Sequence, residues 1–132
     1  MLFRSVMRAV DTNVLVRLIV RDDAAQLQAA ETFVSRGAWV SHLVLAETMW
    51  VLDAVFALPP KRIAAAIEML LHHEALSLQD PEVIAAALLR FRERPSIGFS
   101  DCLVLETARK AGHLPLGTFD RALARFEGAE KL

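Results

Sequence analysis

The sequence has a single cysteine, Cys102, and no long hydrophobic run. One cysteine cannot form an intramolecular disulfide bond, so a disulfide framework is excluded and a reducing cytoplasm is expected. The longest uninterrupted apolar stretch runs only from Val83 to Leu89, whereas a membrane-spanning helix needs about 20 residues. We therefore expect no membrane partner, and we assign the apolar fraction of 55% to a core and a buried subunit interface. A catalytic role for Cys102 is conceivable because it follows Asp101, but burial as a small helix residue is the expected role.

An excess of charge of one sign is also missing, since the formal net charge is −1. That value does not by itself indicate nucleic-acid binding. The first residues contain no sustained apolar segment and no cleavage site, so no signal peptide is expected. Residues 1–6 are predicted to be an N-terminal extension ahead of a natural start at Met7. No repeat or linker divides the chain, so residues 1–132 are predicted to form a single domain.

The hydrophobic pattern predicts strands that alternate with helices. Strands are expected at 6–10, 39–41, 75–78 and 114–117. Helices are expected at 12–20, 24–35, 43–56, 61–72, 81–92, from 100 or 101 to 112, and in a short segment from 120. This alternation is typical of an α/β fold with a parallel sheet covered on both faces. The polar residues at the end of the chain leave a closing fifth strand in doubt.

Four acidic residues lie where a predicted strand ends or beside the start of a helix: Asp11, Glu47, Asp101 and Asp120. The carboxyl ends of parallel strands open into one crevice, where ligands bind. Two carboxylates about 4 Å apart repel each other by roughly 4 kcal/mol at an effective dielectric constant near 20, so a cluster needs a cation or protons. All-oxygen ligands favour Mg²⁺ or Mn²⁺. A metal-dependent reaction on phosphate is therefore the leading hypothesis.

Simpler roles exist for the same residues. Each aspartate is also placed to cap a helix. Glu47 lies inside an apolar helix, so it is expected to be buried and to need a partner, although a position on the helix surface is the alternative. Capping does not readily explain Glu47 or the recurrence of acids in the strand–helix rhythm.

Four segments carry a family resemblance. MRAVDTNVL at 7–15, LAETMWVL at 45–52, IGFSDCLVLETA at 97–108 and LGTFDR at 116–121 resemble the four signature regions of PIN domains. They are most similar to the VapC-type toxin ribonucleases of type II toxin–antitoxin modules. The resemblance implies a PIN-like three-layer α/β/α sandwich with a central, mostly parallel sheet of four to five strands. It also implies that Asp11, Glu47, Asp101 and Asp120 bind one or two Mg²⁺ or Mn²⁺ ions.

The resemblance further implies supporting roles for Asn13 and Thr118. The implied activity is hydrolysis of RNA by a metal-activated water, which leaves a 5′-phosphate and a 3′-hydroxyl. The implied partners are an RNA substrate, a second copy of the chain and a cognate antitoxin, with operator DNA bound only through the antitoxin.

Two other functions remain open. The chain is alternatively a metal-binding co-repressor module in a toxin–antitoxin DNA-binding complex. A phosphatase with Asp11 as its nucleophile is the second alternative, but such enzymes need another aspartate two residues later, where this chain has Asn13.

Overall fold

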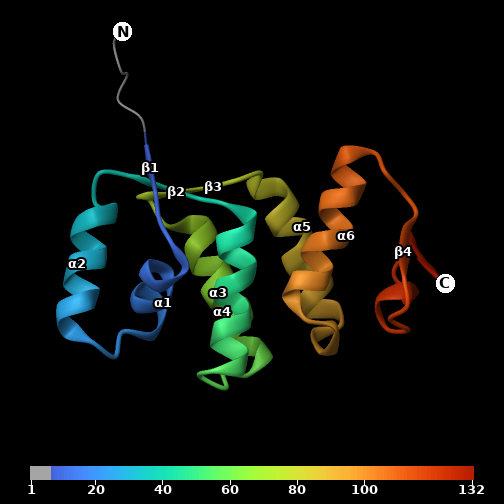
Figure 1. The fold of residues 1–132 in the computed structure, drawn as a ribbon, viewed down its shortest axis with the longest axis horizontal. Coiled ribbons are helices and arrows are strands. Elements are labelled where there is room, and N and C mark those ends of the chain that lie inside the picture. Colours follow the sequence, from blue (N-terminus) through green and yellow to red (C-terminus); the bar gives the residue numbers. More distant parts are fainter. Residues whose placement is uncertain (1–6) are drawn as a thin grey trace, which may run out of the picture. The chain divides into compact units, whose positions relative to one another are not determined.

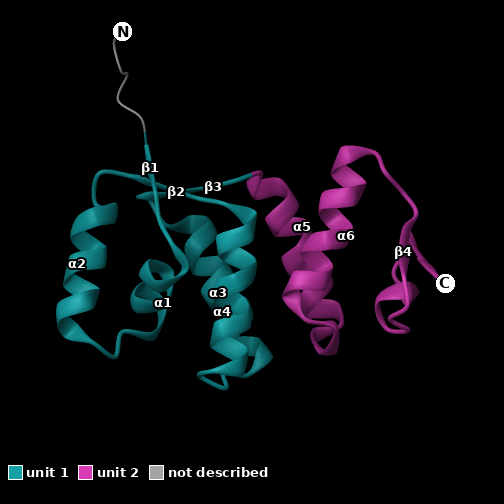
Figure 2. Ribbon diagram, viewed as in Figure 1, with its two compact units in different colours: residues 1–79 teal, residues 80–132 magenta. Residues whose placement is uncertain are grey.

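Parallel strands and helices alternate along the chain, as the hydrophobic pattern predicts. The computed structural model describes residues 7–132, so the predicted extension at residues 1–6 lies outside the described residues. The chain divides into a unit that ends at Gln79 and a unit that runs from Asp80 to Leu132 (Figure 2). Each unit has its own strands and its own helices.

The first unit contains a parallel sheet of three strands in the order β1-β2-β3. Its elements are β1 (Arg8–Ala9), α1 (Thr12–Val20), α2 (Ala24–Val34), β2 (Ala38–Val40), α3 (His42–Ala54), α4 (Pro60–His72) and β3 (Leu76–Leu78). In Figure 1 these four helices lie below β2 and β3. Ala9 pairs with Trp39, and Trp39 pairs with Ser77. Because the strands are parallel, their carboxyl ends, and the starts of α1 and α3 that follow β1 and β2, lie at the same edge of this sheet.

The helices of this unit begin where local sequence signals predict. Asp11 and Ser41 each accept a backbone hydrogen bond from the first turn of α1 and α3, respectively, which satisfies donors that a helix start leaves unpaired. The core comes from one face of each helix. Its largest fully buried members are Leu15, Val16, Val40, Leu45, Thr48, Leu52, Ile67 and Leu70.

The second unit contains two packed helices and a pair of parallel strands. Its elements are α5 (Pro81–Glu93), the 3₁₀ turn η1 (Pro95–Ile97), α6 (Phe99–Ala111), β4 (Leu116–Thr118), the 3₁₀ turn η2 (Leu123–Arg125) and β5 (Ala129–Lys131). The α5–α6 contact buries Ile84 and Leu105, and Phe91 meets Phe99 edge to face with ring centroids 6.3 Å apart. Among residues 7–132, no helix combines the length and the apolar character needed to cross a bilayer.

The predicted α/β class is confirmed, and the doubt about a fifth strand is resolved. The closing strand exists, because Leu116 N–H donates to the carbonyl of Gly128 and Leu132 N–H donates to Thr118. Those backbone bonds do not depend on side-chain polarity. Asp80 precedes α5 but has φ of 38° and makes no side-chain capping bond. Pro81 at the first helical position supplies the start signal instead.

Glu106 is a buried charge that the sequence analysis did not single out. Its side chain is 5% exposed, its Oε1 accepts a hydrogen bond from Arg109 Nε at 3.2 Å, and its Oε2 lies 3.5 Å from Arg90 Nε. Arg109 also donates to the backbone carbonyl of Glu127. Glu106 and its two arginines therefore connect α5, α6 and the segment that leads into β5. Its spacing of four residues from the buried Cys102 is the sequence signal for this position.

Replacing Glu106 with glutamine is expected to lower the free energy of unfolding by about 2 kcal/mol, because Arg109 loses its carboxylate partner and Arg90 loses one of two. This value lies below that of a fully buried pair, since Arg90 and Arg109 are each about one-third exposed. Guanidinium titration followed by circular dichroism measures it. The control is Glu93→Gln, which removes a half-exposed partner of Arg90 and should cost less than about 0.5 kcal/mol. Equal losses in both variants would contradict the assignment.

Candidate active site

Thr12 connects two of the predicted acids at the carboxyl edge of the three-stranded sheet. Asp11 is the N-cap of α1, and its Oδ1 accepts a hydrogen bond from Thr12 N–H at 2.7 Å. The buried hydroxyl of Thr12 donates to Oε1 of Glu47 on α3. Asp11 and Glu47, which we call the first carboxylate pair, are therefore held around one residue. The capping interpretation of Asp11 is confirmed, and capping occupies only one of its two oxygens.

Glu47 is exposed, so the prediction that it is buried in an apolar helix is wrong. The helix packs through Leu45 and Leu52, which leaves Leu43, Glu47 and Trp50 together on another face at helical spacing. Leu43 is 79% exposed and Trp50 is 62% exposed. Apolar residues occur on both faces of α3, so their spacing did not reveal which face is buried.

Neither tryptophan lies in the core, since Trp39 is 39% exposed and Trp50 is 62% exposed.

His42 and Gln79 hold the start of α3 against the end of β3. The backbone N–H of His42 donates to Oε1 of Gln79, and its ring Nε2 bonds the carbonyl oxygen of Gln79, both at 2.8 Å. Gln79 N–H in turn donates to Val40. His42 is thus a hydrogen-bonded structural residue. Asn13 is exposed at the start of α1, and its supporting role stays a prediction.

Asp101 and Asp120 form the second carboxylate pair, within the second unit. Asp101 is half-buried on α6, and burial followed by the negative charge of Asp120 raises the pKa of its carboxyl group. It is not a helix cap, because α6 begins at Phe99 after Gly98, whose φ of 90° favours glycine. The charge effect shows that the two carboxylates lie near enough to repel each other.

Asp120 is positioned by two backbone contacts. Its Oδ1 accepts a hydrogen bond from Leu123 N–H at 2.9 Å, which caps the turn that follows. Its own N–H donates to the hydroxyl of Thr118 at 3.0 Å. The resemblance implies a supporting role for Thr118, and its hydroxyl accepts from the backbone of Asp120 rather than contacting the carboxylate. Thr118 therefore orients the chain that carries the acid.

Cys102 is fully buried on α6, beside the second pair. Burial, together with the charges of Asp101 and Glu106, raises the pKa of its thiol to about 12. A thiol with that pKa is protonated at neutral pH and is a poor nucleophile. The prediction of a small buried helix residue is confirmed, and the catalytic alternative is wrong.

The donor chemistry of both pairs fits a hard divalent cation. Each pair offers carboxylate oxygens, and Mg²⁺ is commonly bound by one or two carboxylates while it keeps several waters. Burial first, and the charge of Asp120 second, raise the pKa of Asp101, and a bound cation would offset both costs of ionising this carboxyl group. Within residues 7–132, no group of three or more His, Cys, Asp or Glu side chains is arranged to hold a metal ion. The joint quartet stays a prediction.

Sequence reasoning missed Thr12, although it named the residues on either side. The signal was its place at the first helical position, directly after a capping aspartate and before a run of apolar residues. A threonine there has a hydroxyl that the capping bond does not use. Only the packing of α1 against α3 shows that this hydroxyl contacts Glu47.

The family model of the PIN domain matches residues 8–129, a span that includes both carboxylate pairs and most of the chain. It confirms the predicted PIN-like α/β/α fold class. No curated protein is similar enough in sequence to count as a match. PIN domains are generally nucleases and typically use divalent metals. The VapC-type assignment and the single domain over residues 1–132 stay predictions.

Replacing Asp101 with asparagine is expected to raise the melting temperature of the metal-free protein by about 2 °C at pH 7. The folded-state pKa of Asp101 lies above its ordinary value of 3.8, so ionisation of this group destabilises the folded form. The wild type loses stability as the pH rises from the pKa of Asp101 in the unfolded state through its pKa in the folded state. Below about pH 4 the group is protonated in both states, so the wild type and Asp101→Asn should melt at the same temperature. Calorimetry in EDTA across this range is the measurement.

The control for this experiment is Glu130→Gln, which removes an exposed charge from β5 in the same unit. It should leave the melting temperature unchanged at every pH. An Asp101→Asn protein that melts below the wild type at pH 7 would contradict a destabilising Asp101 carboxylate, whose pKa is raised by burial and by the charge of Asp120.

Proposed function

Because this chain belongs to the PIN domain family, we propose that it is a metal-dependent endoribonuclease, and specifically the VapC-type toxin of a type II toxin–antitoxin module. One observation carries the proposal. Within residues 7–132, none of Asp11, Glu47, Asp101 and Asp120 has a Lys, Arg or His partner. The buried Glu106, by contrast, has two arginines. Four unpaired acids in the segments that resemble the PIN signatures are suited to a cation.

The four acids are proposed to act together, with Mg²⁺ or Mn²⁺ as the cofactor. Asp11 and Asp101 are the proposed direct ligands, Glu47 ligates or orients the attacking water, and Asp120 ligates a second ion directly or through water. A bound ion would supply an activated water and positive charge beside the scissile phosphate. Thr12 fixes one oxygen of each member of the first pair and leaves the other oxygen available. Water adds to phosphorus, the bond to the 3′ oxygen breaks, and that oxygen leaves as the 3′-hydroxyl.

The proposed protein partners are a second copy of the chain and a cognate antitoxin, with operator DNA bound only through the antitoxin, in the cytoplasm. The exposed face of α3 supports a protein partner, because Leu43 and Trp50 flank Glu47 there. Large apolar side chains gathered on a surface are typical of interfaces. A partner with a basic residue between two apolar ones would match this face in charge and in polarity.

The direct test incubates the purified chain, free of antitoxin, with cellular RNA and either Mg²⁺ or Mn²⁺. Discrete cleavage with 5′-phosphate ends is expected, and EDTA should abolish it. Asp11→Asn and Asp101→Asn should each lower the rate by at least about 100-fold, since even residues that support metal ligands contribute 10- to 100-fold. The matched control is Asp53→Asn, which changes an exposed aspartate outside both pairs. Cyclic phosphate ends, or cleavage that survives EDTA, would overturn the proposal.

Thr12→Val tests whether the threonine hydroxyl positions Glu47. Valine keeps the buried shape and the backbone N–H that bonds Asp11, so only the bond to Glu47 is lost. The expected result is a loss of about 10-fold in kcat with KM unchanged. Thr12→Ser should restore most of kcat, because it retains the hydroxyl. Equal kcat in the valine and serine variants would exclude a positioning role, whatever the change in stability.

A further inference from the structure

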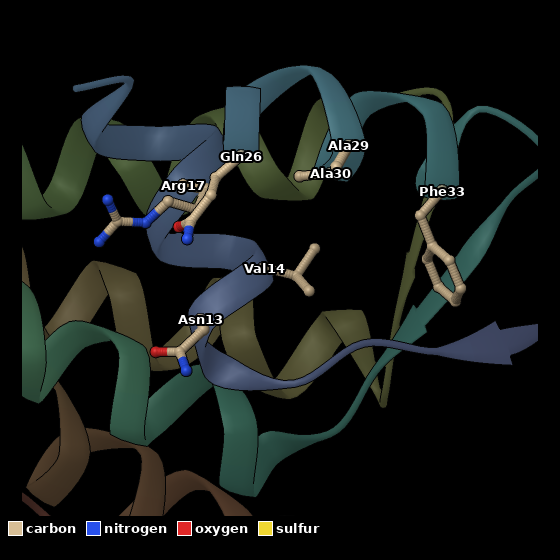
Figure 3. Close-up of a pocket in the computed structure, with 7 residues that line it drawn as sticks. All are labelled: Asn13, Val14, Arg17, Gln26, Ala29, Ala30 and Phe33. Carbon is tan, nitrogen blue, oxygen red and sulfur yellow. The ribbon is translucent and has the colours of Figure 1, made fainter. Parts of the chain in front are cut away.

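Two shallow grooves lie along α2 within the first unit. The first has a volume of about 520 Å³ and separates α1 from α2, with Asn13, Val14 and Arg17 on one side and Gln26 and Phe33 on the other (Figure 3). The second has a volume of about 830 Å³ and includes Arg8 and Arg36. Ala29 and Phe33 line both grooves, so the two meet across α2.

The second groove is cationic. Among the described residues, Arg8 and Arg36 line it and no acidic side chain does. Neither arginine has a carboxylate partner in the part of the chain that the structure describes. In contrast, the nearby Arg17 pairs with Asp22 at 2.8 Å. Two unpaired guanidinium groups in a groove without acids attract an anion, and planar guanidinium groups suit phosphate oxygens.

Phe33 holds Arg8 in place. The guanidinium carbon of Arg8 lies 3.9 Å from the centre of the Phe33 ring, and its Nη2 donates to the Phe33 carbonyl at 3.1 Å. These contacts fix the group while its other N–H donors stay available. An arginine fixed in this way loses less conformational freedom when it binds a phosphate.

The first groove is lined by Asn13 of α1, two residues along the chain from Asp11. The side-chain amides of Asn13 and Gln26 have no hydrogen-bond partner within residues 7–132. Each amide is both a donor and an acceptor, and the apolar side chains of Val14, Ala29 and Phe33 line the same groove. Amides beside an apolar surface suit a nucleobase, which has polar edges and flat apolar faces.

We propose that single-stranded RNA flanking the cleaved bond lies along α2, with a base in the first groove and its phosphates on Arg8 and Arg36. This inference rests on the proposed ribonuclease function and adds the substrate path. The unpaired cations favour RNA over a protein helix as the occupant. Phosphate contacts of this kind position a nucleic acid, whereas base contacts from Asn13 and Gln26 would select its sequence.

The test measures binding of a fluorescein-labelled single-stranded RNA by anisotropy at several KCl concentrations. An Asp101→Asn background with Mn²⁺ prevents cleavage. Each phosphate contact contributes about 0.7 to the slope of log K against log salt for single strands. Arg36→Gln should therefore reduce the slope by about 0.7, and the Arg8→Gln, Arg36→Gln double variant by about 1.4. Arg36 makes no described contact that its loss would break, so the single variant remains informative if the double variant unfolds.

Arg62→Gln is the matched control, because Arg62 is exposed on α4 and lines neither groove. It should leave the slope unchanged. Equal slopes for Arg36→Gln and Arg62→Gln would overturn the substrate path, and would leave a protein partner as the occupant of the grooves.

Cleavage by the protein with intact carboxylates gives the second readout. Arg36→Gln should raise KM several-fold and leave kcat unchanged, since phosphate contacts away from the cut bond contribute to uniform binding. A wild-type protein that cleaves no RNA would refute the proposed function. A wild-type protein that cleaves RNA with the same KM as Arg36→Gln would refute only the path along α2.

Discussion

The hydrogen bond from the buried hydroxyl of Thr12 to Glu47 holds the first carboxylate pair at the edge of the three-stranded sheet. It exists because parallel pairing of β1, β2 and β3 places the starts of α1 and α3 at one edge of the sheet. Gln79 and His42 secure the same edge from β3. The carboxylate of Asp11 caps α1 there, while Glu47 is held one and a half turns into α3. A shift in strand register would separate these groups, so the position of the first carboxylate pair follows from the register of the sheet.

The acidic side chains of the second unit occur in two different environments. Glu106 is buried with two arginines, and it joins three segments of the second unit. Asp101 and Asp120 have no counter-charge among the described residues, and burial followed by the charge of Asp120 raises the pKa of Asp101. The first arrangement stabilises the fold, and the second opposes it. Local destabilisation of this kind is common where a site must bind something that the folded chain lacks.

Two surfaces of the first unit differ in character. The face of α3 around Glu47 presents Leu43 and Trp50, which suit a protein partner. The grooves along α2 present unpaired arginines and free amides, which suit RNA. The first surface includes Glu47 of the first carboxylate pair, whereas the second lies along a different helix.

The sequence by itself determined the order of strands and helices, the α/β class and the start of α1 at Thr12. Those features follow from signals that act over a few residues, such as the cap at Asp11 and Pro81 at the first position of α5. The resemblance to PIN signatures identified the acids, and the structure showed how Thr12 holds Glu47. Tertiary packing decided that Glu47 is exposed and Glu106 is buried, because the buried face of a helix depends on neighbours distant in sequence. Where both faces of a helix carry apolar residues, as in α3, the spacing of those residues does not predict which face is buried.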